Sequence, residues 1–401
     1  MALNAFLSSP LTIQPFSLFI GACMCFSFGL SFFLWRAGPG SAGAKNTMAL
    51  VSLLISMLAL AVIMQAEIPA LRGQVYYLVS IQMLTGPLLY FYVLFQTRPN
   101  FTLQATHLWH LSPVLIFTLI WHWQMPVELN HNLALPCFSN ELCDVYRQNR
   151  YLHKVAAWVS NLAYGFIIIG ILKSYQVQIK RRFSNIEEIN LRWVTMICWC
   201  YILGTLLAIL FEAGYFLGNE FNSGHMHELA MLVTTVLIAH YGVRQVTIHA
   251  EENEEPQNQP VESVSSSNKK YQTSSLTEVD AASLWQQLQQ LMVTEQPYLE
   301  AGLKVSDLAK RLDVSVSHVS ETINGHAGLS FYDFINKQRI EAAIRILEDP
   351  NKAHLSATEV GFEAGFNSVS TFYSHFKNYQ GCTPKQYRSN QSAATVGLAL
   401  N

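Results

Sequence analysis

Residues 356–380 read SATEVGFEAGFNSVSTFYSHFKNYQ, and this stretch decides how the C-terminal part of the chain folds. Apolar residues recur at helical spacing in 356–364 and again in 368–379, where Phe372 and Phe376 fall on one face. Between these helices, Gly365 opens a Gly-Phe-Asn turn and can adopt the left-handed conformation that a tight turn needs. Three hydroxyl side chains project from the other face of the second helix: Ser370, Thr371 and Ser374. The pattern predicts a helix-turn-helix.

A second unit of the same kind lies upstream. Its first helix carries Val305, Leu308 and Leu312, a short turn follows at 313–315, and its second helix buries Val319 and Ile323. Ser317, His318, Glu321 and Asn324 project outward from that second helix, and Ser320 lies at the border of the buried face. The spacing alone would also suit any three-helix bundle, but its repetition favours a tandem arrangement. A helix over 331–347 connects the units and spans about 25 Å at about 1.5 Å per residue. That length suits two recognition helices about one DNA turn, or about 34 Å, apart.

The sequence resembles the DNA-binding signature of the AraC/XylS family. The matching residues of the second half are Gly365–Phe372, Phe376-Lys377, Gly381, Pro384 and Tyr387-Arg388. Those of the first half are Leu308-Ala309, Val319-Ser320, Ile323-Asn324, Phe331–Asn336 and Arg339. The resemblance covers about Leu284–Arg388, and some members of this family also carry multi-spanning N-terminal membrane regions. It implies binding of double-stranded DNA, with base-edge contacts from Ser317, Ser320, Glu321, Ser370, Thr371 and Ser374.

Charge in this domain is nearly balanced. Residues 304–388 hold ten basic and nine acidic side chains, and the net charge of the whole chain is -2. Neither recognition face carries arginine, although bidentate contact between arginine and guanine is the commonest strong readout. Phosphate contacts are expected from Lys310, Arg311, Lys337, Arg339, Lys377, Lys385 and Arg388. Because so few positive charges are in excess, the electrostatic contribution to DNA affinity should be modest. We therefore expect the protein to bind DNA as a homodimer or at adjacent sites.

The N-terminal part has a different composition. The chain is 51% hydrophobic and only 13% charged, whereas a soluble protein carries about 25% charged residues. Seven apolar stretches approach the roughly 20 residues that cross a lipid bilayer. They are Phe16–Trp35, Thr47–Gln65, Val75–Phe95, Leu108–Trp123, Val155–Leu172, Trp193–Leu217 and Met226–Val243. We therefore expect an all-α protein, a seven-helix transmembrane bundle followed by an AraC-type tandem helix-turn-helix domain.

Basic residues near the spans predict the orientation. With the N-terminus outside, nine basic residues flank the inner side and four the outer side, which places the C-terminal domain in the cytoplasm of a bacterial inner membrane. A competing interpretation makes the first span a cleaved signal peptide, because Ala42-Gly43-Ala44 resembles a cleavage site. No basic residue precedes that span, however, and cleavage would leave the DNA-binding domain outside the cell.

The predicted domain boundaries follow these composition changes. Residues 1–248 form the transmembrane sensor region, and 276–390 form the DNA-binding domain, followed by a tail at 391–401. Between them, 249–275 is acidic and then rich in Gln, Ser, Asn and Pro. Such a segment buries too little apolar area to offset its ordering entropy, so it is expected to be a flexible tether.

Two features of the membrane region are candidate sites. Cys137 and Cys143 share the longest outer loop, where they either pair in the oxidising compartment or remain two loop thiols. Polar residues within membrane spans often mark function. Glu212, His225, His227 and Glu228 could line an outward-facing ligand pocket. The alternative is that Glu212 pairs structurally with a neighbouring helix while the histidines are interfacial.

Taken together, the sequence favours a membrane-bound transcription regulator controlled by an unidentified signal ligand, with RNA polymerase as a partner if it activates. A membrane transporter or membrane enzyme with a regulatory tail is the alternative. The spans show no inverted repeat or broken half-helices of the transporter kind. We predict no catalytic residues, no cofactor and no metal.

Overall fold

The computed structural model describes residues 15–38, 40–68, 80–98, 100–124, 141–216, 224–245 and 278–399. The chain divides into two compact units. The first comprises Met1–Lys173 and Leu191–Pro256, and the second comprises Ser174–Asn190 and Gln257–Asn401. All regular secondary structure in the described residues is helical, which confirms the predicted all-α class. The segment 174–190 belongs to the second unit, although it falls inside the range predicted for the sensor region.

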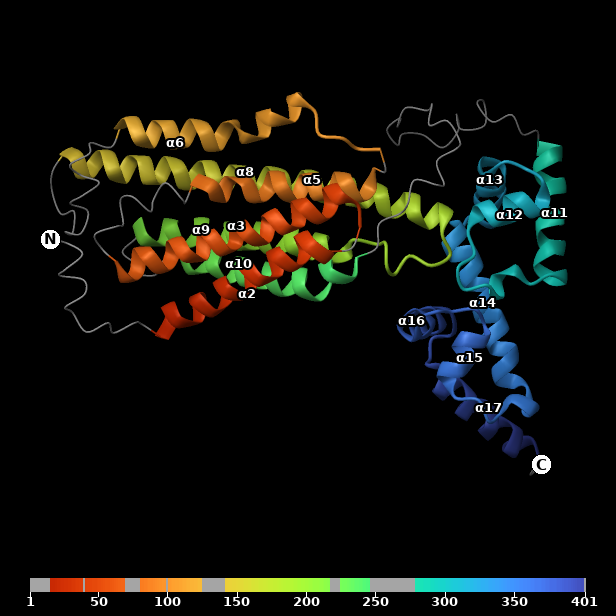
Figure 1. Ribbon diagram of the computed structural model, residues 1–401. Coiled ribbons are helices and arrows are strands. Elements are labelled where there is room, and N and C mark those ends of the chain that lie inside the picture. Colours follow the sequence, from red (N-terminus) through yellow and green to blue (C-terminus); the bar gives the residue numbers. More distant parts are fainter. Residues whose placement is uncertain are drawn as a thin grey trace. The chain divides into compact units, whose positions relative to one another are not determined.

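The first unit is built from helices that run alongside one another in Figure 1. They are α2 (Pro15–Ala37), α3 (Ala42–Glu67), η2 (Ile81–Leu84), α5 (Thr85–Thr97), η3 (Ala105–Leu111), α6 (Ser112–Gln124), α8 (Glu141–Arg182), α9 (Arg192–Phe216), α10 (Gly224–His240) and η4 (Gly242–Arg244). The last residues of α8, from Ser174 onward, belong to the second unit.

Four helices of this unit are long and apolar enough, by length and composition, to cross a membrane. They are Ser17–Ala37, Ala42–Met64, Tyr151–Arg182 and Arg192–Ala213. Two further apolar helices, Ala105–Ile120 and Met231–Arg244, are shorter. The four long helices overlap the predicted first, second, fifth and sixth spans. The predicted third span, Val75–Phe95, is described only from residue 80 onward.

Apolar side chains cover the outside of these helices as well as the inside. Phe32 is 62% exposed and Leu119 is 67% exposed. Inside, small and hydroxyl residues bring the helices together, as is usual for helices packed in lipid. The Ser31 hydroxyl in α2 donates to the Ala49 carbonyl in α3 at 2.7 Å. A Cβ added to Gly86 in α5 would lie 2.8 Å from Tyr164 of α8, so the glycine permits this close approach.

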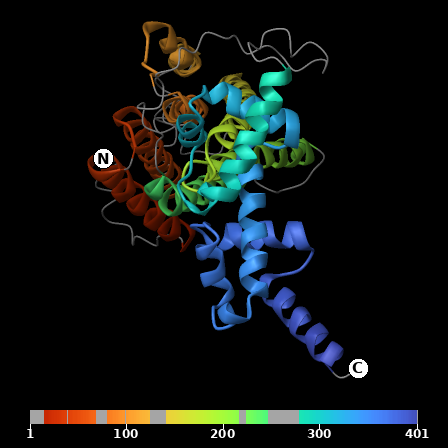
Figure 2. The ribbon, with the colours of Figure 1, turned by 90° about the vertical axis from the view of Figure 1, so that its right-hand side faces the viewer.

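The second unit contains the two predicted helix-turn-helix units. Its helices are α11 (Glu278–Thr294), η7 (Pro297–Leu299), α12 (Val305–Leu312), α13 (Val316–Ala327), α14 (Phe331–Glu348), η8 (Pro350–Lys352), α15 (Ala357–Glu363), α16 (Val369–Gln380) and α17 (Pro384–Ala399). Figure 2 shows α14 running from the α11–α13 group to the α15–α17 group. One apolar core extends through both halves, from Leu288 to Phe376.

Serine side chains fix where four helices of this domain begin. Ser315, Ser330, Ser356 and Ser368 each accept a hydrogen bond from a backbone N–H in the first turn of the helix that follows. Such caps satisfy N–H groups that have no partner within the helix. They place the helix starts within one residue of those predicted from the sequence.

Candidate nucleic-acid interface

The first recognition helix, α13, presents its predicted contact residues at the surface. Ser317 and Glu321 are exposed and Ser320 is half-buried. The Ser317 hydroxyl lies 3.4 Å from Oε1 of Glu321, so the two side chains are neighbours on one face. The opposite face carries Val319 and Ile323, both fully buried in the core. Helical periodicity therefore directs the polar positions away from the domain.

The second recognition helix, α16, is arranged in the same way. Ser370 and Ser374 are exposed and Thr371 is half-buried, while Phe372 and Phe376 are completely buried. The hydroxyl oxygens of Ser368 and Ser370 lie 2.9 Å apart at the N-terminal end of the helix. Short hydroxyl side chains reach base edges only when the helix docks closely in the groove.

The turn before α16 depends on glycine. Gly365 has φ +89°, in the left-handed region, as the sequence predicts. A Cβ at this position would also lie 2.5 Å from the carbonyl oxygen of Tyr298 in η7. Glycine is thus needed here for two reasons, because the backbone is left-handed and because η7 approaches too closely to leave room for a Cβ.

Five of the predicted phosphate-contacting residues are exposed, namely Lys310, Arg311, Lys337, Lys377 and Lys385. The two arginines Arg311 and Arg388 also make intramolecular bonds. Arg311 donates to both carboxylate oxygens of Glu300, at 2.7 and 2.9 Å, and these bonds raise the pKa of its guanidinium. The half-buried Arg388 donates from Nη1 to the Leu355 carbonyl.

The predicted phosphate contact from Arg339 is wrong. Its side chain is 1% exposed, and burial lowers its pKa to about 10. In α14 it follows Ile335 by four residues and precedes Ala343 by four, so it shares their buried face. Its Nε donates to the Tyr298 carbonyl and its Nη2 to the Glu300 carbonyl, both at 2.7 Å. Arg339 therefore joins α14 to the segment before α12.

In the first unit, Glu212 pairs with Lys154 of α8. Nζ of Lys154 lies 2.7 Å from Oε2 and 2.8 Å from Oε1 of the carboxylate, and the two side chains are 23% and 12% exposed. This agrees with the structural alternative for Glu212. His225, His227 and Glu228 belong to the start of α10, but their side chains lie outside the described residues, as do Cys137 and the side chain of Cys143.

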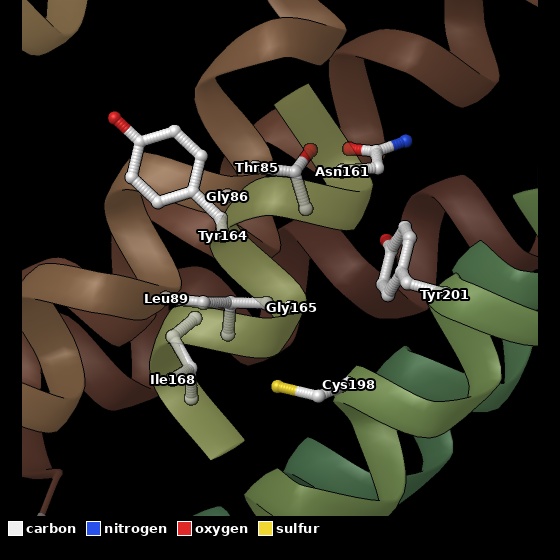
Figure 3. Close-up of a pocket in the computed structure, with 9 residues that line it drawn as sticks. All are labelled: Thr85, Gly86, Leu89, Asn161, Tyr164, Gly165, Ile168, Cys198 and Tyr201. Carbon is white, nitrogen blue, oxygen red and sulfur yellow. The ribbon is translucent and has the colours of Figure 1, made fainter. Parts of the chain in front are cut away.

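A separate hollow in the first unit was not predicted from the sequence. It lies between α5, α8 and α9 and has a cavity volume of about 20 Å³, which is roughly the space that one water molecule needs. Figure 3 shows its lining residues, among them Asn161 of α8 and Tyr201 of α9, each on its own helix beside the space. Small-molecule sites are usually larger, at about 300–1,000 Å³. Asn161 is a polar residue inside the predicted apolar span Val155–Leu172, and its presence there was the sequence signal available.

Within the described residues, no three His, Cys, Asp or Glu side chains gather closely enough to hold a metal ion.

Comparison with known proteins identifies the C-terminal domain. Residues 308–390 match a family described as a helix-turn-helix domain. Over 88 residues the chain is 31% identical to the transcriptional regulatory protein HptR of Staphylococcus aureus, covering 22% of this chain and 33% of that protein. Over 98 residues it is 33% identical to an uncharacterized HTH-type transcriptional regulator of the same species, covering 24% and 13% respectively.

Among solved structures, the C-terminal domain of the two-component response regulator yesN from Fusobacterium nucleatum is 30% identical. The match covers 27% of this chain and 98% of that domain, with a TM-score of 0.23. The chain thus spans a third or less of the length of these curated relatives. Residues 308–390 are therefore similar to helix-turn-helix domains, and the relatives that share this part of the chain are named as transcriptional regulators.

Proposed function

We propose that the protein is a membrane-bound transcription regulator that binds specific DNA sequences and is controlled by a signal perceived in its membrane region. The observation that carries this proposal is the pair of helix-turn-helix units joined by α14, each with an outward polar face on its second helix. At about 1.5 Å per residue, α14 spans about 27 Å, which suits recognition helices placed in successive turns of the major groove.

In this proposal the outward faces of α13 and α16 read bases. Ser317, Ser320 and Glu321 contact one half of the site, and Ser370, Thr371 and Ser374 contact the other. The exposed Lys310, Lys337, Lys377 and Lys385 hold phosphates, together with Arg311 and Arg388 where their intramolecular bonds permit. Because residues 304–388 have a net charge of only +1, one domain binds weakly and a homodimer or adjacent sites supply the remaining affinity.

The N-terminal region is proposed to cross the bacterial inner membrane seven times and to leave the C-terminal domain in the cytoplasm. The four long apolar helices and the two shorter ones overlap six of the seven predicted spans and support a membrane region. The excess of basic residues on the predicted inner side supports the orientation. This region perceives the signal ligand either from outside the cell or from within the lipid bilayer. RNA polymerase is the further partner if the protein activates transcription.

The test is to map DNA crosslinked to the full-length protein in cells, alongside a chain that ends before residue 276. The full chain is expected to enrich a shared sequence motif that the shortened chain does not. A membrane transporter or enzyme whose tail only regulates it would keep its membrane activity after this deletion and would enrich no motif. Absence of any enriched motif for the full chain overturns the proposal.

A further inference from the structure

The segment 174–190 packs into the DNA-binding domain. It comprises the last turns of α8 and the loop before α9, and it belongs to the same unit as residues 278–399. The loop is held against the end of α8, because the Tyr175 hydroxyl in α8 donates to the Ile189 carbonyl in the loop at 2.9 Å. The segment therefore has a defined shape when it meets the domain.

Backbone pairing begins the contact. Phe183 and Lys304 form an antiparallel bridge just before α12. The backbone N–H of Ser184 donates to the Leu303 carbonyl at 3.2 Å, and its hydroxyl donates to the same oxygen at 2.6 Å. Ser184 is 1% exposed, so these bonds are shielded from water.

The buried Arg339 makes the second part of the contact. Its Nη2 donates to the Ser184 hydroxyl at 3.1 Å, and its Nη1 to the Ser184 carbonyl at 3.3 Å. Asn336 of α14 approaches the same carbonyl at 3.5 Å. A buried guanidinium is costly unless its N–H groups are satisfied, so these oxygens help to stabilise its charge. The connecting helix α14 is thereby tied both to Ser184 and to the carbonyls before α12.

A third contact reaches towards the second recognition helix. The ammonium of Lys180 lies 5.4 Å from the centre of the Tyr332 ring, within range of a cation–π interaction. The Tyr332 hydroxyl in turn lies 3.0 Å from Nε2 of His375 in α16. Segment 180–184 thus contacts α14 and, through one intervening side chain, α16.

We propose that residues 180–184 are an intramolecular docking element whose seating favours DNA binding. When it is docked, Arg339 is satisfied and α14 holds the two recognition helices in one arrangement, so less ordering remains to be done on DNA. Because α8 begins at Glu141, the element also gives the sensor region a covalent route to the domain that is distinct from residues 249–275. This inference rests on the proposed function for its DNA readout, but docking itself can be measured separately.

Docking is tested first, with the full chain in lipid nanodiscs. Cysteines at both bridged positions, Phe183→Cys with Lys304→Cys, should form a disulfide under mild oxidation, because paired residues of a bridge lie within disulfide reach. The matched control is Phe183→Cys with Gln287→Cys, since Gln287 is exposed on α11. Peptide mapping distinguishes the new bond from bonds to native cysteines. Equal yields for both pairs would overturn the proposal.

The effect on DNA is tested with Ser184→Lys, which places an ammonium against the buried guanidinium. Asn185→Lys adds the same charge at the next residue and is the control. On the DNA motif enriched by the wild-type chain, Ser184→Lys should bind at least about fivefold more weakly than the control, a typical coupling between sites. Equal affinity of the two variants refutes the role in DNA binding.

A second pair of variants and the disulfide yield decide the outcome if Ser184→Lys does not fold or if no DNA binding is seen. If Ser184→Lys fails to fold, Lys180→Gln is compared with Arg181→Gln, because Arg181 is the exposed neighbour on the same helix. The first should weaken binding more than the second, and equality again counts against the proposal. If the wild-type chain binds no DNA, the proposed function fails. The disulfide yield then still decides whether the element docks.

Discussion

The two helix-turn-helix units share a plan but differ in what holds them together. The first turns at Asp313, a non-glycine residue with φ 55°, and packs α13 through the aliphatic residues Val319 and Ile323. The second turns at Gly365 and packs α16 through Phe372 and Phe376, with ring centroids 5.6 Å apart. Large rings and a crowded glycine leave little room for adjustment. Substitutions in the second helix-turn-helix should therefore lower the stability of the domain more than substitutions in the first.

The largest effect on stability is expected from the aromatic core of the second helix-turn-helix. Phe372→Ala or Phe376→Ala should each lower the free energy of unfolding of the domain from residue 276 onward by about 3–5 kcal/mol. Ile323→Ala, the matching truncation in the first helix-turn-helix, removes fewer carbon atoms and should cost less, within a range of about 2–5 kcal/mol. Chemical denaturation followed by circular dichroism measures both. Equal losses in the two units would show that their cores do not differ in the way described.

The glycine turn is expected to rank second. Gly365→Ala must place a Cβ against the backbone of η7 and hold an L-residue at positive φ, so it should destabilise the domain by more than about 2 kcal/mol. Gly328→Ala is the matched control, because Gly328 has φ +67° and open space around its Cβ position. Its cost should be only the backbone term, about 1 kcal/mol. Equal melting temperatures for the two variants would show that contact with η7 adds nothing to the cost of Gly365→Ala.

This contrast also shows what the sequence could reveal. The bounds of α15 and α16 were predicted to within one residue, because a serine cap, a glycine and an apolar period all mark the same positions. In the N-terminal region, the predicted span Val155–Leu172 is only part of α8, which runs from Glu141 to Arg182. Hydropathy detects the apolar segment alone, whereas helical hydrogen bonding continues through the polar residues on either side.

The candidate site was predicted unevenly for a similar reason. The outward positions on α13 and α16 follow from helical period, and all of them are exposed or half-buried. Arg339 was assigned to phosphate by residue type, yet its register with Ile335 and Ala343 already placed it on the buried face. The contact of Ser184 with Arg339 joins residues 155 positions apart, and no local pattern predicts such a pairing.

The third effect concerns which unit reads which bases. Replacing Ser370, Thr371 or Ser374 by Ala should change the preferred sequence in one half of the site, at about 1–3 kcal/mol per affected base pair. Ser317→Ala and Glu321→Ala should change the other half. Selection from a random DNA pool measures both. Lys377→Gln is the control, because loss of a phosphate contact should flatten the salt dependence by about one unit of slope and leave the motif unchanged. Hydroxyl variants that select the wild-type motif would make α16 a backbone clamp.

The smallest expected effect is a pH dependence of stability that arises in the second helix-turn-helix. Burial lowers the pKa of His375, and the charges of Lys180 and Arg339 lower it further, while Asp333 opposes them. A histidine with a lowered pKa in the folded state is held neutral there, so below its ordinary pKa, about 6.5, the unfolded chain binds the extra proton. Stability is thus fully present above about pH 6.5 and declines as the pH falls towards the folded-state pKa.

His375→Gln should remove this acid-side loss while keeping a polar group near the Tyr332 hydroxyl, 3.0 Å from the wild-type ring nitrogen. Melting temperatures of the domain from residue 276 onward, compared at pH 7.5 and about 5.5, measure the difference between variant and wild type. Lys180 is absent from that fragment. There the pKa of His375 is lowered only by burial and by the charge of Arg339, so the lowering should be smaller than in the full chain. Because other groups also titrate over this range, the test is the difference between the two proteins at each pH. A wild-type domain that loses no more stability than the variant on acidification would show that His375 is not held neutral by its surroundings.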